Sequence, residues 1–166
     1  NIEGHSGMLR NAQVEADLTP ATISLDPVGY RKAPGSPASA QINAHFDPKG
    51  DIAMAAVTVS GSGLAAQGTL NFVNGTMARA DFPVVRAGAN NDFALSLVKT
   101  APNGTDIAVK GASADGTGFS RNSGESAGAS GKPQPPGPPL HITARLDRVV
   151  VTDRAALSPF SLDMTE

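Results

Sequence analysis

Apolar residues occur at every second position over long stretches of this chain, and this alternation constrains the fold more than any other feature. In residues 38–46 the apolar side chains are separated by Ser, Gln, Asn and His, and the same pattern recurs in 12–18, 64–72 and 93–97. A period of two places the apolar side chains of a strand on one face and the polar ones on the other. The pattern therefore predicts an antiparallel sheet with one apolar side.

Short turn sequences separate the alternating segments. Asn74-Gly75 favours a type I′ hairpin turn, because both residues tolerate positive φ angles. Residues 47–51 place Pro early and Gly late, an arrangement typical of a turn between strands. The chain therefore predicts a meander of consecutive strands joined by turns of a few residues. We expect its strands at 38–46, 52–60, 64–72, 77–85, 92–99 and 105–111.

The ends of the chain predict further sheet on both sides of this meander. Residues 12–19 and 21–25 have strand character and are separated by Pro20, and 26–37 are rich in Pro and Gly, which predicts a loop. Residues 121–139 are almost wholly Ser, Gly, Ala and Pro and predict a disordered linker. We therefore expect a leading segment (1–11), an antiparallel β domain (12–120), this linker, and strands in 140–166 that continue the sheet.

Composition predicts a thin core. The chain is 40% apolar, yet it holds only six Phe, one Tyr and no Trp, and much of its apolar content is Ala. Small residues favour strong curvature of a sheet over a filled interior. The predicted fold is therefore all-β with little helix, a curved antiparallel meander with an open apolar groove. A β-sandwich or a closed barrel is the alternative.

Several classes of site are disfavoured. There are no cysteines, and the formal net charge of −2 comes from scattered charges without the basic cluster that nucleic acid requires. His5, His45 and His141 lack metal-ligand spacing, and Gly4-His5-Ser6-Gly7 lacks the second glycine of a nucleophile elbow. We expect no enzyme activity, no catalytic residue, no metal, no cofactor and no nucleic-acid partner.

The candidate functional residues are the larger apolar side chains of the meander. They would form an apolar face that contacts lipid, or they would pack as an ordinary core against a second sheet. They are Leu64, Leu70, Phe72, Phe82, Phe93, Leu95, Leu97, Ile107 and Val109.

Five segments of the chain, taken in order, resemble the long AsmA-like proteins of the YhdP type. One departure is Tyr30, where members of that family commonly carry Trp. The linker at 121–139 is also unusually long for them. The segments that carry the resemblance are DLTPATISL (17–25), VGYRKAPGSPA (28–38), LAAQGTL (64–70), RADFPVVRAGAN (79–90) and LHITARLDRVVV (140–151).

The resemblance implies a fragment of a bacterial cell-envelope protein that extends through the periplasm from an inner-membrane anchor outside this chain. Such a protein would take part in phospholipid transport between the two membranes and in outer-membrane integrity, using an apolar β-groove. Its partners would be phospholipid acyl chains, flanking β segments of the same longer chain, and envelope proteins. A non-catalytic structural or protein-interaction β module is the alternative. A carbohydrate-binding sandwich is disfavoured by the shortage of aromatic platforms.

Overall fold

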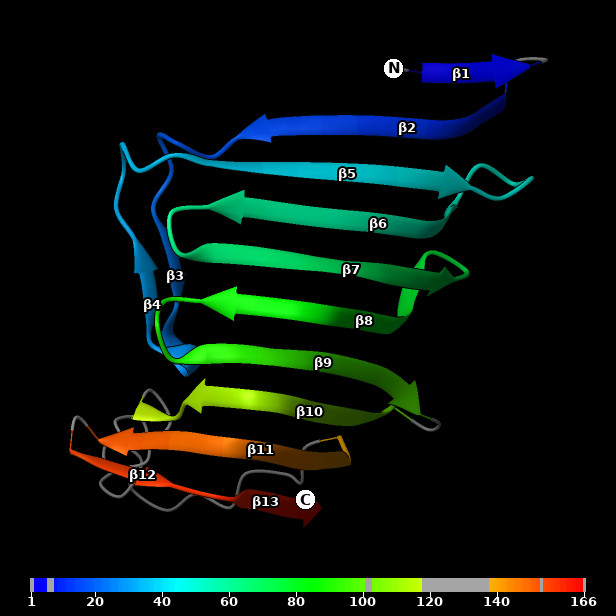
Figure 1. Ribbon diagram of the computed structural model, residues 1–166. Coiled ribbons are helices and arrows are strands. Elements are labelled where there is room, and N and C mark those ends of the chain that lie inside the picture. Colours follow the sequence, from blue (N-terminus) through cyan, green and yellow to red (C-terminus); the bar gives the residue numbers. More distant parts are fainter. Residues whose placement is uncertain (1, 6–7, 101–102, 118–137, 153, 166) are drawn as a thin grey trace, which may run out of the picture.

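The computed structural model describes residues 2–5, 8–100, 103–117, 138–152 and 154–165, and these form an all-β fold (Figure 1). One large sheet holds eleven strands, and a second sheet holds two. The strands of the large sheet are β1 (Ile2–His5), β2 (Met8–Asp17), β5 (Ala38–Phe46), β6 (Ile52–Gly61), β7 (Leu64–Val73), β8 (Thr76–Ala87), β9 (Asn91–Thr100), β10 (Gly104–Asp115), β11 (Leu140–Thr152), β12 (Ala155–Leu157) and β13 (Phe160–Thr165).

The predicted meander is confirmed. Strands β5 to β10 lie side by side in sequence order, and each pairs antiparallel with the next. The turn between β7 and β8 has the expected hairpin geometry, because Asn74 and Gly75 have φ angles of 51° and 73°. Asn103, in the next turn on the same side of the sheet, also has a positive φ of 70°.

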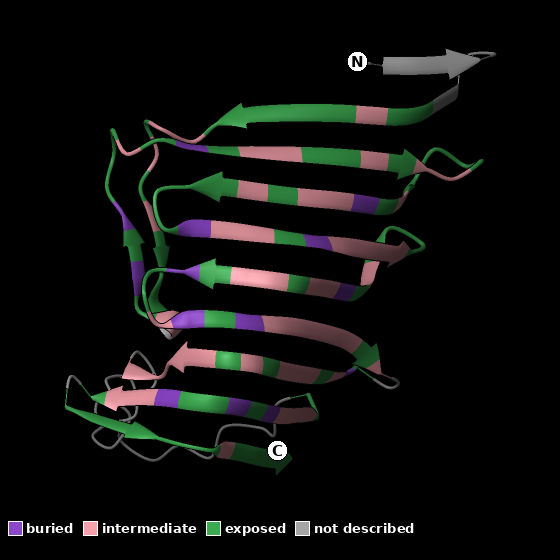
Figure 2. Cartoon of the chain, in the orientation of Figure 1, coloured by how far each residue is buried: buried purple, intermediate pink, exposed green. Residues whose placement is uncertain are grey.

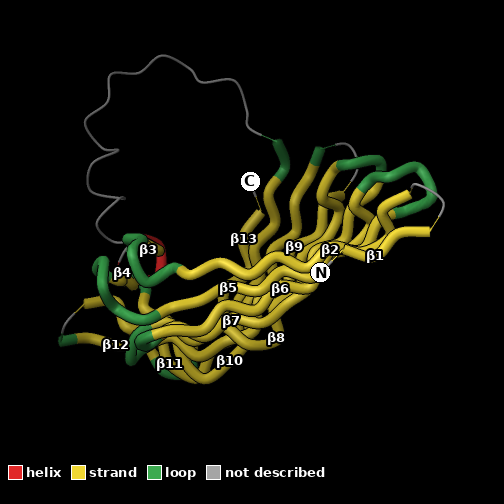
Figure 3. Tube along the Cα trace, turned by 90° about the horizontal axis from the view of Figure 1, so that it is seen from above, coloured by secondary structure: helices red, strands yellow, loops and turns green. Residues whose placement is uncertain are grey.

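The large sheet is curved and does not close on itself. β1 stands at one end of the strand order and β12 at the other, so the described strands form neither of the closed alternatives, a barrel or a sandwich. Seen along the stack of strands, each strand bends, and the sheet has a concave and a convex side (Figure 3). The curvature agrees with the prediction drawn from the many small residues.

The second sheet lies at one end of these strands. It consists of β3 (Ile23–Leu25) and β4 (Tyr30–Lys32), joined by the single-turn 3₁₀ helix η1 (Asp26–Val28), and we call residues 23–32 the rim hairpin. It runs across the ends of the long strands on the concave side of the large sheet (Figures 1 and 3).

The strands expected at 12–19 and 21–25 are present in part but are not neighbours, and the prediction of a simple loop over 26–37 is wrong. β2 instead pairs with β5, and β3 pairs with β4, which lies inside the predicted loop. Sequence alternation could not reveal this, because three-residue strands are too short to show a period. β2 also begins at Met8, so the predicted leading segment already belongs in part to the sheet.

The sequence predicts an antiparallel sheet, but the large sheet contains one parallel pair of strands. β11 continues the sheet as expected for 140–166, but it pairs parallel with β10 over Thr105–Asp115. A parallel neighbour needs a connection long enough to return to the starting end of the preceding strand. The predicted linker at 121–139 is such a connection, and its residues 121–137 lie outside the described part of the chain.

A bulge in β8 keeps the apolar residues on one face. Phe82 pairs with Leu95 and Val85 with Phe93, so β8 uses one residue more than β9 over this interval, and Pro83 falls within it. Proline suits a bulge, since a ladder hydrogen bond is interrupted there. The Phe82 ring lies against Gly68 of β7, where an added Cβ would come within 2.5 Å of the ring and 2.4 Å of the Asp81 carbonyl oxygen.

Gly68→Ala is therefore expected to lower the free energy of unfolding by about 1–3 kcal/mol, the range for overpacked sites. Urea denaturation followed by circular dichroism would measure it. Ala56→Ser, on the opposite face of the neighbouring strand, is the control and should change stability by less than about 0.5 kcal/mol. Equal stability of the two variants would show that Gly68 is not a site of close approach.

Candidate functional site

The cross-strand register assembles the alternating apolar residues into continuous rows. Directly paired residues of neighbouring strands share a face, so a row can be followed from strand to strand. The longest row crosses nine strands, about 38 Å at a spacing of about 4.8 Å. Its members are Ala12, Ala44, Ala55, Leu70, Ala80, Leu97, Ile107, Ile142 and Met164.

Two further rows lie beside this one, both on the side toward the rim hairpin, and complete what we call the apolar face. One row runs on the side toward the rim hairpin and includes Val14, Ile42, Val57, Phe82, Leu95, Val109, Ala144 and Leu162. The next includes Ala16, Ala40, Val59, Ala66, Val85, Phe93, Leu146 and Phe160. None of these described residues is charged, and the face is therefore apolar across the width of the sheet.

The structure brings most of the predicted site residues together on this face. Leu70, Leu97 and Ile107 share the longest row, Phe82, Leu95 and Val109 share the second, and Phe93 lies in the third. Leu64 lies on the same strand face as Leu70, beyond the third row, where Tyr30 packs on it. Phe72 pairs with Met77 next to an irregularity in the register, at the opposite end of β7.

Sequence reasoning missed the members of the apolar face that lie toward the two ends of the sheet. Val14, Ile42, Leu162 and Met164 belong to the same rows as the predicted residues and are 37–53% exposed. The same alternation marks them in the sequence, so the signal was present.

Burial on the apolar face is uneven. Leu64, Ala87 and Phe93 are at most 8% exposed, whereas Val14 and Ile42 on the same face are 53% and 37% exposed. Leu64, Ala87 and Phe93 lie at the ends of β7, β8 and β9 beside the rim hairpin, although alanines farther along the rows, such as Ala55 and Ala80, are also buried (Figure 2). Tyr30 and Val28 of the hairpin pack on them, in two small clusters centred on Leu64 and Phe93. The hairpin thus covers one margin of the face.

Buried polar groups hold the rim hairpin in place. Asn91, 5% exposed, donates from its amide nitrogen to the carbonyl oxygens of Val28 (2.8 Å) and Ala87 (2.7 Å), and its side-chain oxygen accepts a bond from the Asp115 N–H (2.9 Å). Tyr30 Oη donates to the Ser62 carbonyl oxygen at 2.9 Å. These bonds connect the hairpin, directly or through Asn91, to the termini of several long strands at the same end of the sheet.

Lys32 stabilises the hairpin from within. Its side chain is buried with the residue 3% exposed, and Nζ donates to the carbonyl oxygens of Thr19, Ala21 and Ala33 at 2.8–3.2 Å. Three carbonyl acceptors satisfy the three donors of an ammonium group. The charge therefore organises local backbone and does not form part of a surface cluster.

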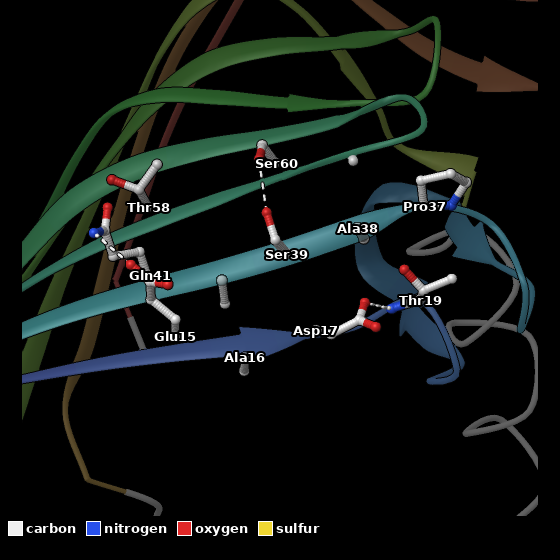
Figure 4. A pocket seen from close by; sticks show the side chains of 12 residues that line it. Glu15, Ala16, Asp17, Thr19, Pro37, Ala38, Ser39, Gln41, Thr58 and Ser60 are labelled. Carbon is white, nitrogen blue, oxygen red and sulfur yellow. Dashed lines mark hydrogen bonds between the residues drawn. The ribbon is translucent and has the colours of Figure 1, made fainter.

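The opposite, polar face carries the hydrophilic half of the alternation. Near β2, β5 and β6 it has a hollow of about 700 Å³, lined by Glu15, Gln41 and Thr58 among others, whose side chains point to the same side of the sheet (Figure 4). Ser39 and Ser60 hydrogen-bond across the neighbouring strands there at 3.2 Å. These groups bond to one another along the sheet, as cross-strand polar pairs do.

A second hollow of about 610 Å³ lies over the β8 bulge on the polar face and includes Asp81 and Ser96. Hydrogen bonds from Arg79 and from Ser96 hold the pKa of the Asp81 carboxyl below its ordinary value. His141, farther along this face, lies 3.0 Å from Asp163 and 3.8 Å from Asp106. Within the described ranges, no group of three or more acidic or histidine side chains is arranged to hold a metal ion.

Asn91→Ala is expected to lower the free energy of unfolding by about 2–3 kcal/mol, because it leaves two carbonyl oxygens and one N–H without their partner. Hydrogen exchange should rise first in residues 23–32, since these lose their anchor. Asn90→Ala, in the adjacent turn, is the control and should have a smaller effect. Unchanged protection of 23–32 in Asn91→Ala would show that this amide does not anchor the hairpin.

Asp81→Asn is expected to lower stability at pH 7 by at most about 1 kcal/mol, as for other exposed ion pairs. The folded-state pKa of Asp81 is depressed, so the stabilisation is present above the unfolded value and is lost as pH falls through the folded one. The difference between wild type and variant should therefore be full above about pH 4, the ordinary carboxyl value, and should shrink as the pH falls below it. Urea titrations at pH 7 and pH 3 would measure the two differences, and a difference at pH 3 as large as that at pH 7 would contradict this assignment.

No helix among the described residues has the length and apolar character needed to cross a membrane. Comparison of the chain with protein-family models, with curated proteins and with solved structures found no match. The apolar face, with one margin covered by the rim hairpin, is accordingly the candidate functional site on physical grounds.

Proposed function

We propose that this chain is a non-enzymatic segment of a periplasmic protein that carries phospholipid acyl chains on its apolar face. In the full-length protein, tethered to the inner membrane, the segment would contribute to phospholipid transport between the inner and outer membranes and to outer-membrane integrity. The observation that carries the proposal is the continuity of the apolar rows across nine strands, with exposed members such as Val14, Ile42 and Met164.

Area considerations support an apolar ligand. Burial of apolar surface contributes about 25 cal/mol per Å², so covering about 300 Å² of acyl chain and protein is worth roughly 7 kcal/mol before the costs of association. Such contacts need no specific polar group. A ligand that moves along a face requires contacts of this kind, because one tight polar site would hold it in place.

Charge distribution supports a lipid over a polar ligand. The described charged residues of the long strands, among them Glu15, Arg79, Asp81 and Lys110, lie outside the three apolar rows. A hydrocarbon chain on those rows would meet no charge to desolvate, which is the main cost of burying ionised groups. The resemblance to AsmA-like proteins supports the periplasmic location and the lipid class.

A structural or protein-interaction β module is the second candidate. It is favoured by β12 and β13. These two short strands pair with β11, and most of their own residues are exposed. Exposed strands can add a partner strand through their backbone groups. Envelope proteins and flanking β segments of the same longer chain are the partners of this candidate.

Ile42→Asp and Asn43→Asp form a matched pair that separates the candidates. The two positions are adjacent on β5, both exposed, and lie on the apolar and the polar face respectively. After expression in bacteria, native mass spectrometry should detect phospholipid on wild type and Asn43→Asp, and at least about tenfold less on Ile42→Asp, since a new carboxylate costs more than 1.4 kcal/mol against hydrocarbon.

Circular dichroism would verify that both variants keep the sheet. Phospholipid retained equally by both folded variants, or found on none of the three proteins, would reject the lipid proposal. The interaction module would then be the better candidate.

A further inference from the structure

We infer that the rim hairpin seals one long side of the apolar face, so that a bound phospholipid presents its headgroup at the opposite side. This inference rests on the proposed function and adds the orientation of the ligand. The opposite side, which we call the open rim, is formed by the turns at 47–51 and 74–75 (Figure 1).

The seal is visible in the burial of the residues beneath the hairpin. Leu64, Ala87 and Phe93 are 6%, 0% and 8% exposed, and Leu146 and Val149 of β11 are 6% and 7% exposed. Tyr30 contacts the first two, and Val28 packs on the cluster that contains the other three. The hairpin therefore covers its margin from β7 to β11, and a lipid has no apolar surface to occupy there.

The hairpin is a fixed part of this margin. Tyr30 Oη is bonded to the Ser62 carbonyl oxygen in the β6–β7 turn, and Asn91 joins Val28 to the start of β9. Asn91 also accepts the N–H of Asp115 at the end of β10. Successive strand ends are thus tied to one short element, and a headgroup could leave beneath it only by breaking these part-buried hydrogen bonds.

The buried cation of the hairpin is not available to a headgroup. The Lys32 ammonium already donates to three carbonyl oxygens, so the buried cation of the hairpin is committed to its own backbone. At the open rim, by contrast, the sheet simply ends in hairpin turns. Ile52 and Val73, next to those turns, are 39% and 60% exposed. A zwitterionic or anionic headgroup that emerges there remains in water.

Single-cysteine reporters can test this orientation, because the chain contains no cysteine. Lys49→Cys lies in a turn of the open rim, and Arg31→Cys lies on the rim hairpin; both native residues are exposed and basic. A strand of about ten residues spans about 33 Å, so the two reporters are well separated. Each would carry a small thiol-linked fluorophore.

The probe is phosphatidylcholine with a nitroxide on its headgroup, loaded onto the 166-residue chain. We expect quenching of the Lys49→Cys reporter to be several-fold stronger than that of the Arg31→Cys reporter. Equal quenching, or stronger quenching at Arg31→Cys, would overturn the inference.

A second probe separates this result from failure of the proposed function. Phosphatidylcholine with a nitroxide midway along one acyl chain should quench a reporter at Ile42→Cys on the apolar face more than one at Asn43→Cys on the polar face. Absence of that difference would reject the lipid function itself. If the difference is present while the headgroup probe shows no preference for Lys49→Cys, only the orientation is wrong.

Discussion

The structure depends on a register that keeps apolar residues in line from strand to strand. A slip of one residue in any strand would transfer its apolar side chains to the polar face, so nine strands must agree for the longest apolar row to persist. Turn geometry maintains the agreement at several points, for example at Asn74-Gly75. The apolar face is therefore a cooperative property of the sheet.

Local irregularities preserve this register. In β8 the bulge at Pro83 adds one residue between Phe82 and Val85, and both remain on the apolar face. Gly68 on the neighbouring strand leaves room for the Phe82 ring, and Gly111 of β10 leaves room in the same way beside Phe93. Glycine is needed at these positions because a side chain would collide with backbone or ring atoms. Small residues beside large ones thus allow neighbouring strands of the curved sheet to approach closely while the large side chains stay on the apolar face.

The rim hairpin converts a uniform apolar surface into an asymmetric one. Without it, the rows would be equally accessible from both ends of the strands. With Tyr30 and Val28 packed on Leu64 and Phe93, one margin becomes a small core, whereas members of the rows such as Val14 and Ile42 stay exposed. The covered side of the apolar face supplies buried contacts that stabilise the fold. The other side remains available for an apolar ligand.

The central part of this protein follows from its sequence alone. A period of two and the turn residues between the strands determined the all-β class, the meander of β5 to β10, and the shared face of Leu70, Leu97 and Ile107. Both signals are local, since each strand's faces and each tight turn depend on a few consecutive residues.

Only the tertiary structure decided the pairing of β2 with β5, the parallel pairing of β10 with β11, and the position of the rim hairpin. These features join residues far apart in the chain, and Asn91 and Lys32, which hold the hairpin, acquire their roles from carbonyl groups that only folding brings near. The physical reason is that alternation specifies which face a residue occupies, whereas the choice of neighbouring strand depends on long-range packing.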